Sequence, residues 1–234
     1  MSTLTAHDYS ILKTLFGHES SPAEEARVDL DVSSDLECND KQYRVIRAAE
    51  KDILRSLDNS PAEPTLVQNV VQGLSALIKR YPGYASAYIN RAQAHRLLLL
   101  TEDLFSSRHA AATTDILKDL RRGIELARPA KPCQAVSGDR AKILAVAYAH
   151  RGYLLLRAAD LVRNGYTISG VGEGLQSSTP DQIGDLASAD FAAAARFGDK
   201  TAPQLAARIN PYAKMCGAIV KEAMRREMEE ASKI

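Results

Sequence analysis

The chain has 234 residues, of which 45% are hydrophobic and 25% charged, and this composition excludes an intrinsically disordered protein. Thirty basic residues stand against 29 acidic ones, so the net charge of +1 provides no long-range attraction to nucleic acid or to an anionic membrane. Abundant Ala, Leu and Arg, together with no Trp and four Phe, favour an all-α fold.

The amino-terminal residues 1–40 are predicted to be an extension to the folded body. Thr5–Phe16 places its apolar residues on one helical face, and Val28, Leu30 and Val32 alternate with acidic residues as in an extended segment. The chain shows no signal-peptide pattern and no apolar run as long as a membrane span. Three widely separated cysteines suggest no disulfide framework, so we expect a cytoplasmic protein, with the nucleus as a further compartment.

Residues 41–209 are predicted to form three pairs of helices. Apolar side chains recur at four-residue steps from Val45 to Leu57, and similar patterns follow along the chain. The expected helices are 41–57, 65–80, 85–100, 114–128, 141–163, 181–197 and 201–208, the second capped by Thr65 and the sixth opened by Thr179 or Asp181. Residues 210–234 are expected to add a capping helix, begun by Asn210-Pro211, and a charged tail.

Three polar or turn-rich insertions are expected to lie on the surface between these helices: 101–113, 129–138 and 164–180. The last of them is rich in Gly and Ser, which predicts a flexible loop.

The first helices of the second and third pairs repeat a sequence pattern. Ala85–Ala92 and Ala145–Gly152 each place an Arg and a small residue three and four positions after a tyrosine, and Leu117–Leu126 aligns with Ser188–Phe197 in the second helices. The pattern is typical of tetratricopeptide repeats, where the small residue allows the paired helix to approach closely. The two tyrosines are 60 positions apart (148 minus 88). An uninterrupted array has a period of about 34, so the insertions must stretch the spacing.

Four segments extend the match beyond a generic repeat: Ile11–Phe16 followed by Val28–Asp31, Ala85–Leu97, Arg151-Gly152 with Ala189–Ala195, and Ile209–Cys216. They resemble the tetratricopeptide repeat protein 36 family, and the chain looks like a fungal-type member with longer loops. The resemblance implies a small cytosolic adaptor of three repeats. It also implies association with Hsp70-type chaperones and a role in tyrosine breakdown through the stability of a pathway enzyme.

The tetratricopeptide-repeat pattern implies that the first helix of each pair lines a concave face, where a protein partner or an extended peptide docks. The residues expected on this face are Ser86, Ile89, Asn90, Gln93, Arg96 and Leu97 in the second pair, and Val146, Ala149, His150, Tyr153, Leu156 and Arg157 in the third.

Chaperone-binding members of this repeat class hold the carboxylates of a peptide C-terminus through charge-assisted hydrogen bonds. Asn90 matches one position of such a clamp and Arg151 another, whereas Ile53 and Leu155 stand where an Asn and an Arg are expected. The alternative interpretation is that Asn90 bridges neighbouring helices and that Arg151 pairs with a carboxylate within the protein.

No catalytic, cofactor-binding or metal site is predicted. His95, His109 and His150 have no Ser, Cys or carboxylate at a motif spacing, and His95 is expected to be structural. Gly170–Gly174 lacks the preceding strand and the following Lys of a phosphate-binding loop. The residues expected on exposed helix faces are Asp115, Asp119, Glu125, Asp190 and the basic clusters at Lys118, Arg121-Arg122 and Arg225-Arg226, whereas Tyr212 and Cys216 are expected in the core.

The sequence therefore predicts a non-catalytic adaptor that binds a protein, with a chaperone or a client enzyme as the expected partner. A second hypothesis is a structural subunit that self-associates through exposed helix faces. A third is an enzyme that uses the glycine-rich loop.

Overall fold

The computed structural model describes residues 28–29, 40–58, 63–130, 134–209 and 225. It confirms the all-α helical-repeat fold. The described elements are β1 (Val28–Asp29), α2 (Asp40–Asp58), α3 (Pro64–Arg80), α4 (Ala85–Leu97), the 3₁₀ helix η1 (Ser107–His109), α5 (Ala110–Ala127), β2 (Val136–Ser137), α6 (Gly138–Arg163), α7 (Glu173–Gln176), α8 (Pro180–Arg196) and α9 (Ala202–Ile209).

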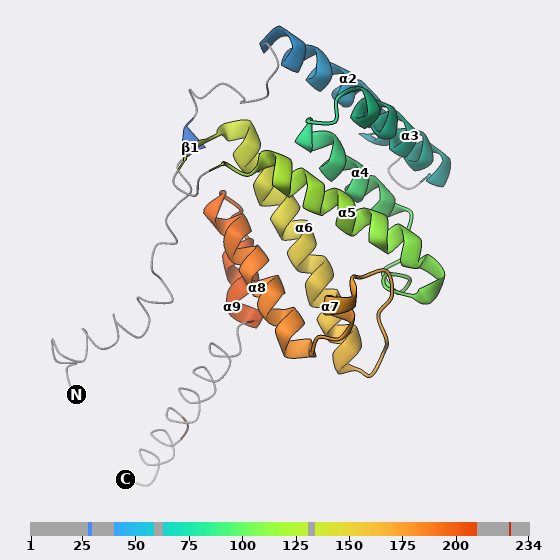
Figure 1. Cartoon of the computed structure of the whole chain (residues 1–234), viewed down its shortest axis with the longest axis vertical. Helices are drawn as coiled ribbons and strands as arrows, with labels where there is room; N and C mark the ends of the chain where they lie inside the picture. The colour runs from blue at the N-terminus through green and yellow to red at the C-terminus, as the bar shows by residue number, and fades with distance from the viewer. Residues whose placement is uncertain (1–27, 30–39, 59–62, 131–133, 210–224, 226–234) are drawn as a thin grey trace, which may run out of the picture.

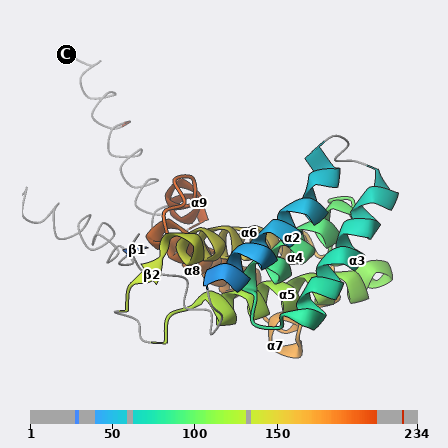
Figure 2. The same cartoon turned by 90° about the horizontal axis from the view of Figure 1, so that it is seen from above.

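The long helices form a row in which each packs on its neighbours along the chain. The packed pairs are α2 with α3, α4 with α5, and α6 with α8, and contacts of α3 with α4, of α5 with α6 and of α8 with α9 continue the row. Figures 1 and 2 place α8 and α9 at one end and α3 at the other. Because α4 also contacts α6, the first helices of the second and third pairs lie side by side.

Small residues allow the helices of a pair to approach closely. A Cβ added to Gly152 on α6 would lie 3.3 Å from the Ala187 carbonyl oxygen and from the Phe191 ring of α8. One added to Gly123 on α5 would lie 2.2 Å from the Ile89 side chain of α4. A larger residue at either position would force its neighbours to shift, so the glycines favour the close approach of the paired helices.

The described helices bury their apolar side chains in two separate clusters. One cluster joins α2, α3 and the outer side of α4, with Ile46, Leu74 and Tyr84 among its members. The larger cluster runs from α4 to α9 and includes Leu120 and Phe191. The first pair therefore has a core of its own beside that of the other two.

Helix α8 begins at the N-cap that the sequence predicted. The hydroxyl of Thr179 accepts from the Gln182 N–H, and the Gln182 side chain accepts from the Thr179 N–H, which completes a capping box. The expected cap of α3 is wrong, because Thr65 lies inside the first turn and donates to Glu63. The helix starts one residue earlier at Pro64, whose missing N–H costs least at this position.

The insertions before α5 and after α6 are packed against each other. Phe105 and Ile168 are buried, and the Ser169 N–H donates to the Phe105 carbonyl at 2.8 Å. The Thr114 hydroxyl donates to the Gly170 carbonyl at 3.0 Å. The prediction of a flexible loop over 164–180 is therefore wrong, because buried apolar contacts and hydrogen bonds hold its first part in place.

Part of the expected extended segment forms a strand. Val28–Asp29 of β1 pairs in parallel with Val136–Ser137 of β2, which lies in the segment predicted as the linker 129–138. The expected helix over Thr5–Phe16 and the capping helix, with Tyr212 and Cys216, lie outside the described residues. None of the described helices combines the length and the apolar character needed to cross a bilayer.

Candidate protein-binding face

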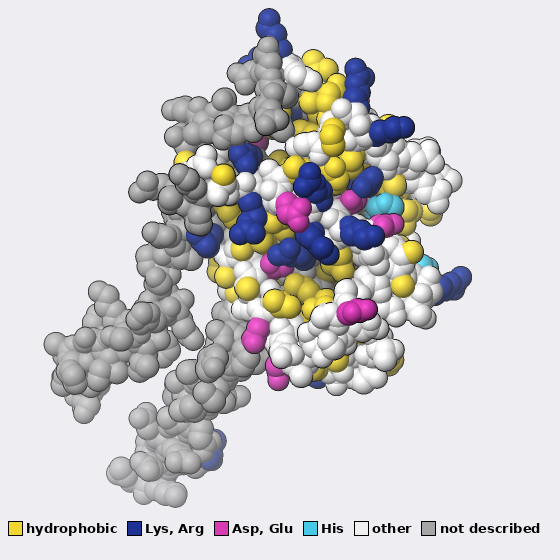
Figure 3. Space-filling view, viewed as in Figure 1, with side chains coloured by type: hydrophobic (Ala, Val, Ile, Leu, Met, Phe, Trp, Pro, Cys, Tyr) yellow, Lys and Arg dark blue, Asp and Glu magenta, His cyan; other side chains and the backbone are white. Residues whose placement is uncertain are grey.

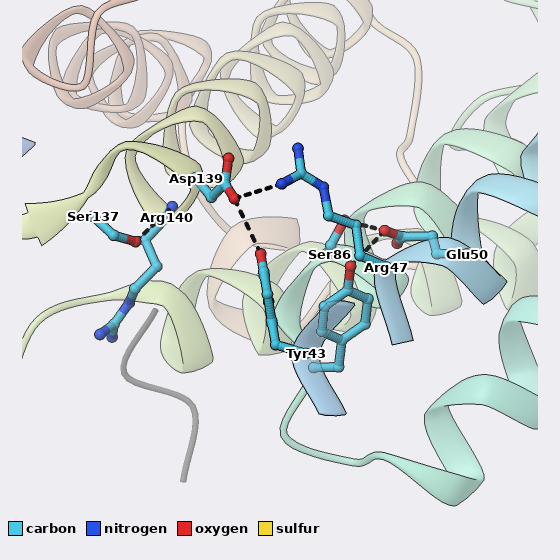
Figure 4. Close-up of polar contacts among 8 residues, drawn as sticks. Tyr43, Arg47, Glu50, Ser86, Ser137, Asp139 and Arg140 are labelled. Carbon is cyan, nitrogen blue, oxygen red and sulfur yellow. Dashed lines mark hydrogen bonds and ion pairs between the residues drawn. The ribbon is translucent and has the colours of Figure 1, made fainter. Parts of the chain in front are cut away.

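The first helices of the three pairs, α2, α4 and α6, together form one surface, which we call the first-helix face. Side chains connect α2 to the start of α6 across it: the Arg47 guanidinium lies 2.9 Å from Asp139, and the Tyr43 hydroxyl donates to the same carboxylate at 3.4 Å. Figure 4 shows both groups pointing at Asp139. Burial is the main cause that raises the pKa of Tyr43 to about 12, and the negative charge of Asp139 adds to it.

A buried carboxylate connects α2 to α4 next to this contact. Glu50 is 6% exposed and accepts hydrogen bonds from the Tyr84 hydroxyl at 2.7 Å, from Ser86 at 3.0 Å and from the Asn90 amide at 2.8 Å. Figure 4 shows Ser86 on α4 pointing at this carboxylate. Burial and the adjacent Glu50 charge raise the pKa of Tyr84 above its ordinary value. The predicted site residue Asn90 thus donates within the protein and bridges two helices, as its alternative interpretation held.

Arg151 also has a partner within the protein. Its Nε and Nη2 donate to the two oxygens of Asp190 on α8, each at 2.7 Å, and its guanidinium lies 5.4 Å from the centre of the Tyr148 ring. The hydrogen bonds to Asp190 are the main cause that raises the pKa of Arg151. The structure therefore places Arg151 as in its alternative interpretation, paired with a carboxylate between α6 and α8.

The preceding pair repeats this arrangement. Arg91 on α4 donates from Nε and Nη2 to Asp119 on α5, both at 2.7 Å, and lies 5.9 Å from the centre of the Tyr88 ring. The expectation that Asp119 and Asp190 are exposed is wrong, since they are 5% and 6% exposed. Asp115 and Glu125 are exposed as predicted.

Among the apolar residues expected on the binding face, Ile89 is placed elsewhere. It is 3% exposed and packs on Gly123 of α5, because a helical position next to the paired helix faces the core. Leu97, Val146 and Tyr153 are 55%, 43% and 44% exposed, so this part of the face presents large apolar side chains to solvent. The other expected residues, Ser86, Gln93, Ala149 and Leu156, are partly buried.

Three basic side chains lie beside these apolar residues. Arg96 donates to the Leu99 carbonyl and to the Thr101 hydroxyl, both neutral acceptors. The Nδ1 of His150 and the Nε of Arg157 are buried and have no hydrogen-bond partner among the described residues. Burial, and then the positive charge of Arg96, lower the pKa of His150 to about 4. Nothing in the sequence pattern pointed to the unpaired nitrogens, because helical spacing does not show which donors lack acceptors.

The remaining candidates for chemistry are dispersed. Among the described residues, no group of three or more His, Cys, Asp or Glu side chains could hold a metal ion. Gly170 packs against the Ala110 carbonyl, and Gly172 precedes the four-residue helix α7. His95 is half-buried, and its burial lowers its pKa.

The opposite side of the row carries charges of both signs. Lys118, Arg121 and Arg122 on α5 are exposed, and Arg122 lies 3.4 Å from Glu125. Figure 3 shows Lys and Arg over this side together with Asp and Glu. The mixture is that of a solvated helix surface, as the sequence predicted for the α5 cluster.

The chain aligns over nearly its whole length with three proteins. The L-tyrosine degradation gene cluster protein hmgX of Aspergillus fumigatus is 39% identical in an alignment 241 positions long, gaps included. The alignment covers 97% of this chain and 94% of that protein. Tetratricopeptide repeat protein 36 of Bos taurus is 25% identical, and its Drosophila melanogaster homolog 24%, each over 94% of both chains. No family model and no solved structure matches the chain.

Proposed function

We propose that this chain, which belongs to the family of the L-tyrosine degradation gene cluster protein hmgX, is a non-catalytic adaptor that binds another protein and thereby supports tyrosine breakdown. The link to tyrosine breakdown is drawn from the name of the Aspergillus relative. Binding is drawn from the first-helix face and from the tetratricopeptide-repeat names of the other two relatives.

The observation that supports binding most is the exposure of Leu97, Val146 and Tyr153 on one side of a packed row of helices. Large apolar side chains that a rigid scaffold leaves exposed together often mark a surface that another protein covers. A tyrosine in such a patch contributes a large contact area at a low entropic cost.

Affinity capture from cells grown on tyrosine tests this proposal. The unaltered chain should retain a partner that Tyr153→Ala retains poorly. Tyr166→Ala is the matched control, because Tyr166 is 65% exposed in the segment after α6 and lies outside the first-helix face. If no partner is captured, or if Tyr153→Ala retains it as well as the control does, the proposal is wrong.

The tyrosine link needs a test in the cell. Deletion of the gene should slow growth on tyrosine as the nitrogen or carbon source, and a gene carrying Tyr166→Ala should restore growth better than one carrying Tyr153→Ala. Growth that is equal with and without the gene would contradict the link.

The Hsp70-type chaperone implied by the resemblance stays a predicted partner, as does a client enzyme. The clamp interpretation of Asn90 and Arg151 receives no support from the geometry, because Glu50 and Asp190 already accept their hydrogen bonds. We therefore expect a chaperone, if captured, to bind through other residues of the face.

Self-association is the second candidate function, since Val45 and Leu186 are also exposed, at 63% and 49%. A particle mass in solution that is a multiple of 25.5 kDa, combined with the absence of a captured partner, would favour it over the adaptor.

A further inference from the structure

The α4–α6 part of the first-helix face combines exposed apolar groups with basic groups that have no acidic partner among the described residues. We call the six residues Arg96, Leu97, Val146, His150, Tyr153 and Arg157 the basic-apolar strip. Val146, His150, Tyr153 and Arg157 follow one another at steps of four, three and four residues, so they lie on one face of α6. Arg96 lies close enough to His150 for its charge to act on the imidazole.

The arginines of the strip differ from six others in the described chain. Arg47, Arg55, Arg91, Arg122, Arg151 and Arg163 each lie within 4 Å of a carboxylate. Within the described residues, Arg96 has only neutral acceptors, and Arg157 has a buried Nε with no acceptor. A buried donor without an acceptor costs free energy, and an acceptor supplied by a ligand removes that cost.

We propose that the basic-apolar strip binds an acidic segment of a partner protein, in which Asp or Glu side chains stand next to apolar ones. The carboxylates would accept from Arg96 and Arg157 in charge-assisted hydrogen bonds, and the apolar side chains would cover Leu97, Val146 and Tyr153. The positive charges select an acidic occupant over a neutral or basic one. This inference rests on the proposed function and names the chemistry of the partner.

Two pools of short fluorescent peptides provide the probe. The acidic pool contains random sequences of Asp, Glu, Leu, Ile, Ser and Gly, and the amide pool has Asn and Gln in place of Asp and Glu. The chain should bind the acidic pool more tightly by fluorescence anisotropy, and added salt should weaken this preference. Equal binding of both pools, or complete competition by inorganic phosphate at the peptide's own concentration, would overturn the inference.

Substitutions in the strip locate the site. Arg96→Gln and Arg157→Gln should each weaken binding of the acidic pool about tenfold, roughly the contribution of one charge-assisted hydrogen bond. Arg122→Gln on α5 removes the same charge from an exposed ion pair elsewhere and should leave binding unchanged. Arg157→Lys should restore part of the affinity, which separates a lost charge from a folding defect. An equal effect of Arg122→Gln would contradict the assignment.

His150 reports on the bound anion directly. Its ring signals, followed by NMR while the acidic pool is added, should shift, and the pKa of the imidazole should rise because a carboxylate lies nearby. The amide pool should not change it. An unchanged His150 with the acidic pool bound would place the peptide elsewhere and overturn the inference.

Failure of this inference can be told apart from failure of the proposed function. One result is a captured partner that binds the Arg96→Gln and Arg157→Gln variants normally but fails to bind the Tyr153→Ala variant. That result would support the adaptor function and refute the acidic segment. If no partner is captured and neither pool binds, both are refuted.

Discussion

At the scale of single residues, a buried ion pair is repeated in two successive helix pairs. Arg91 with Asp119, and Arg151 with Asp190, each join a first helix to a second helix through two hydrogen bonds of 2.7 Å. Both carboxylates are less than a tenth exposed, so solvent stabilises their negative charge little. Each therefore depends on the positive charge and the hydrogen bonds of its arginine.

Loss of one partner of such a pair should destabilise the fold. Asp190→Ala leaves Arg151 unpaired, and we expect the free energy of unfolding to fall by about 3 kcal/mol. Glu125→Ala, which removes an exposed pair on α5, should cost less than about 1 kcal/mol. Urea unfolding followed by circular dichroism measures both. A similar loss in the two variants would show that the pair with Asp190 contributes no more than a surface contact.

His150 should make stability depend on pH. Its pKa in the folded chain, about 4, lies below the ordinary value of 6.5, so the unfolded chain takes up a proton more readily between these values. This contribution is fully present above about pH 6.5 and is lost as the pH falls towards 4. Between about pH 7 and pH 5, the free energy of unfolding of the unaltered chain should fall by up to about 2 kcal/mol more than that of His150→Gln.

Urea unfolding at several pH values measures this difference. Arg96→Gln is an informative companion, because removal of the nearby charge should raise the pKa of His150 and flatten the dependence in part. Identical pH profiles for the unaltered chain and His150→Gln would refute the prediction.

At the scale of elements, the packing of the insertion after α6 depends on a glycine at position 170. Gly170 has φ of 78°, and a Cβ there would lie 2.4 Å from the Ala110 carbonyl oxygen. Gly165 has nearly the same φ, 81°, but its surroundings are open. The two glycines therefore separate the cost of the backbone conformation from the cost of a steric clash.

Gly170→Ala should destabilise the chain by about 3 kcal/mol or more, since the clash with backbone adds to the strain of a positive φ. Gly165→Ala should cost only the strain, about 1 kcal/mol. Hydrogen exchange of the Ser169 N–H, which donates to Phe105, should quicken in the first variant and remain slow in the second. Equal effects would mean that the segments 101–109 and 164–172 do not depend on this packing.

At the scale of the whole molecule, the two apolar clusters predict uneven stability along the row. Glu50 joins the first cluster to α4 through Tyr84, Ser86 and Asn90. In a repeat array each unit contacts mainly its neighbours. The first pair also reaches α6 through Tyr43 and Arg47 at Asp139, but Glu50 is bonded to α4, so its loss should act mainly on the adjacent end.

Glu50→Ala leaves the Tyr84 hydroxyl and its companion donors without their acceptor, at an expected cost of about 3 kcal/mol. Amides of α2 and α3 should then exchange faster, whereas those of α6 and α8 should change little. Asp52→Ala, an exposed position on the same helix, should leave exchange unchanged. Uniform acceleration along the row would show one cooperative unit instead.

Local sequence patterns were enough to predict the helices and their pairing. Apolar periodicity, proline and glycine breaks and the repeated Tyr-x-x-Arg pattern are local signals, so they located α2, α4, α6 and α8 within a few residues. The Thr179 cap could be predicted for the same reason, since an N-cap bonds within its own first turn.

The partners of the polar side chains follow from the packing of the helices. Helical spacing placed His150, Tyr153 and Arg157 on one face, but it could not show that Arg151 pairs with Asp190, or that the insertion at Gly170 docks near Phe105. Hydrogen bonds between residues distant in sequence depend on how the helices pack, and local patterns carry no such information. The unpaired nitrogens of His150 and Arg157 emerged in the same way, because a polar atom is known to lack a partner among the described residues only when its neighbours are placed.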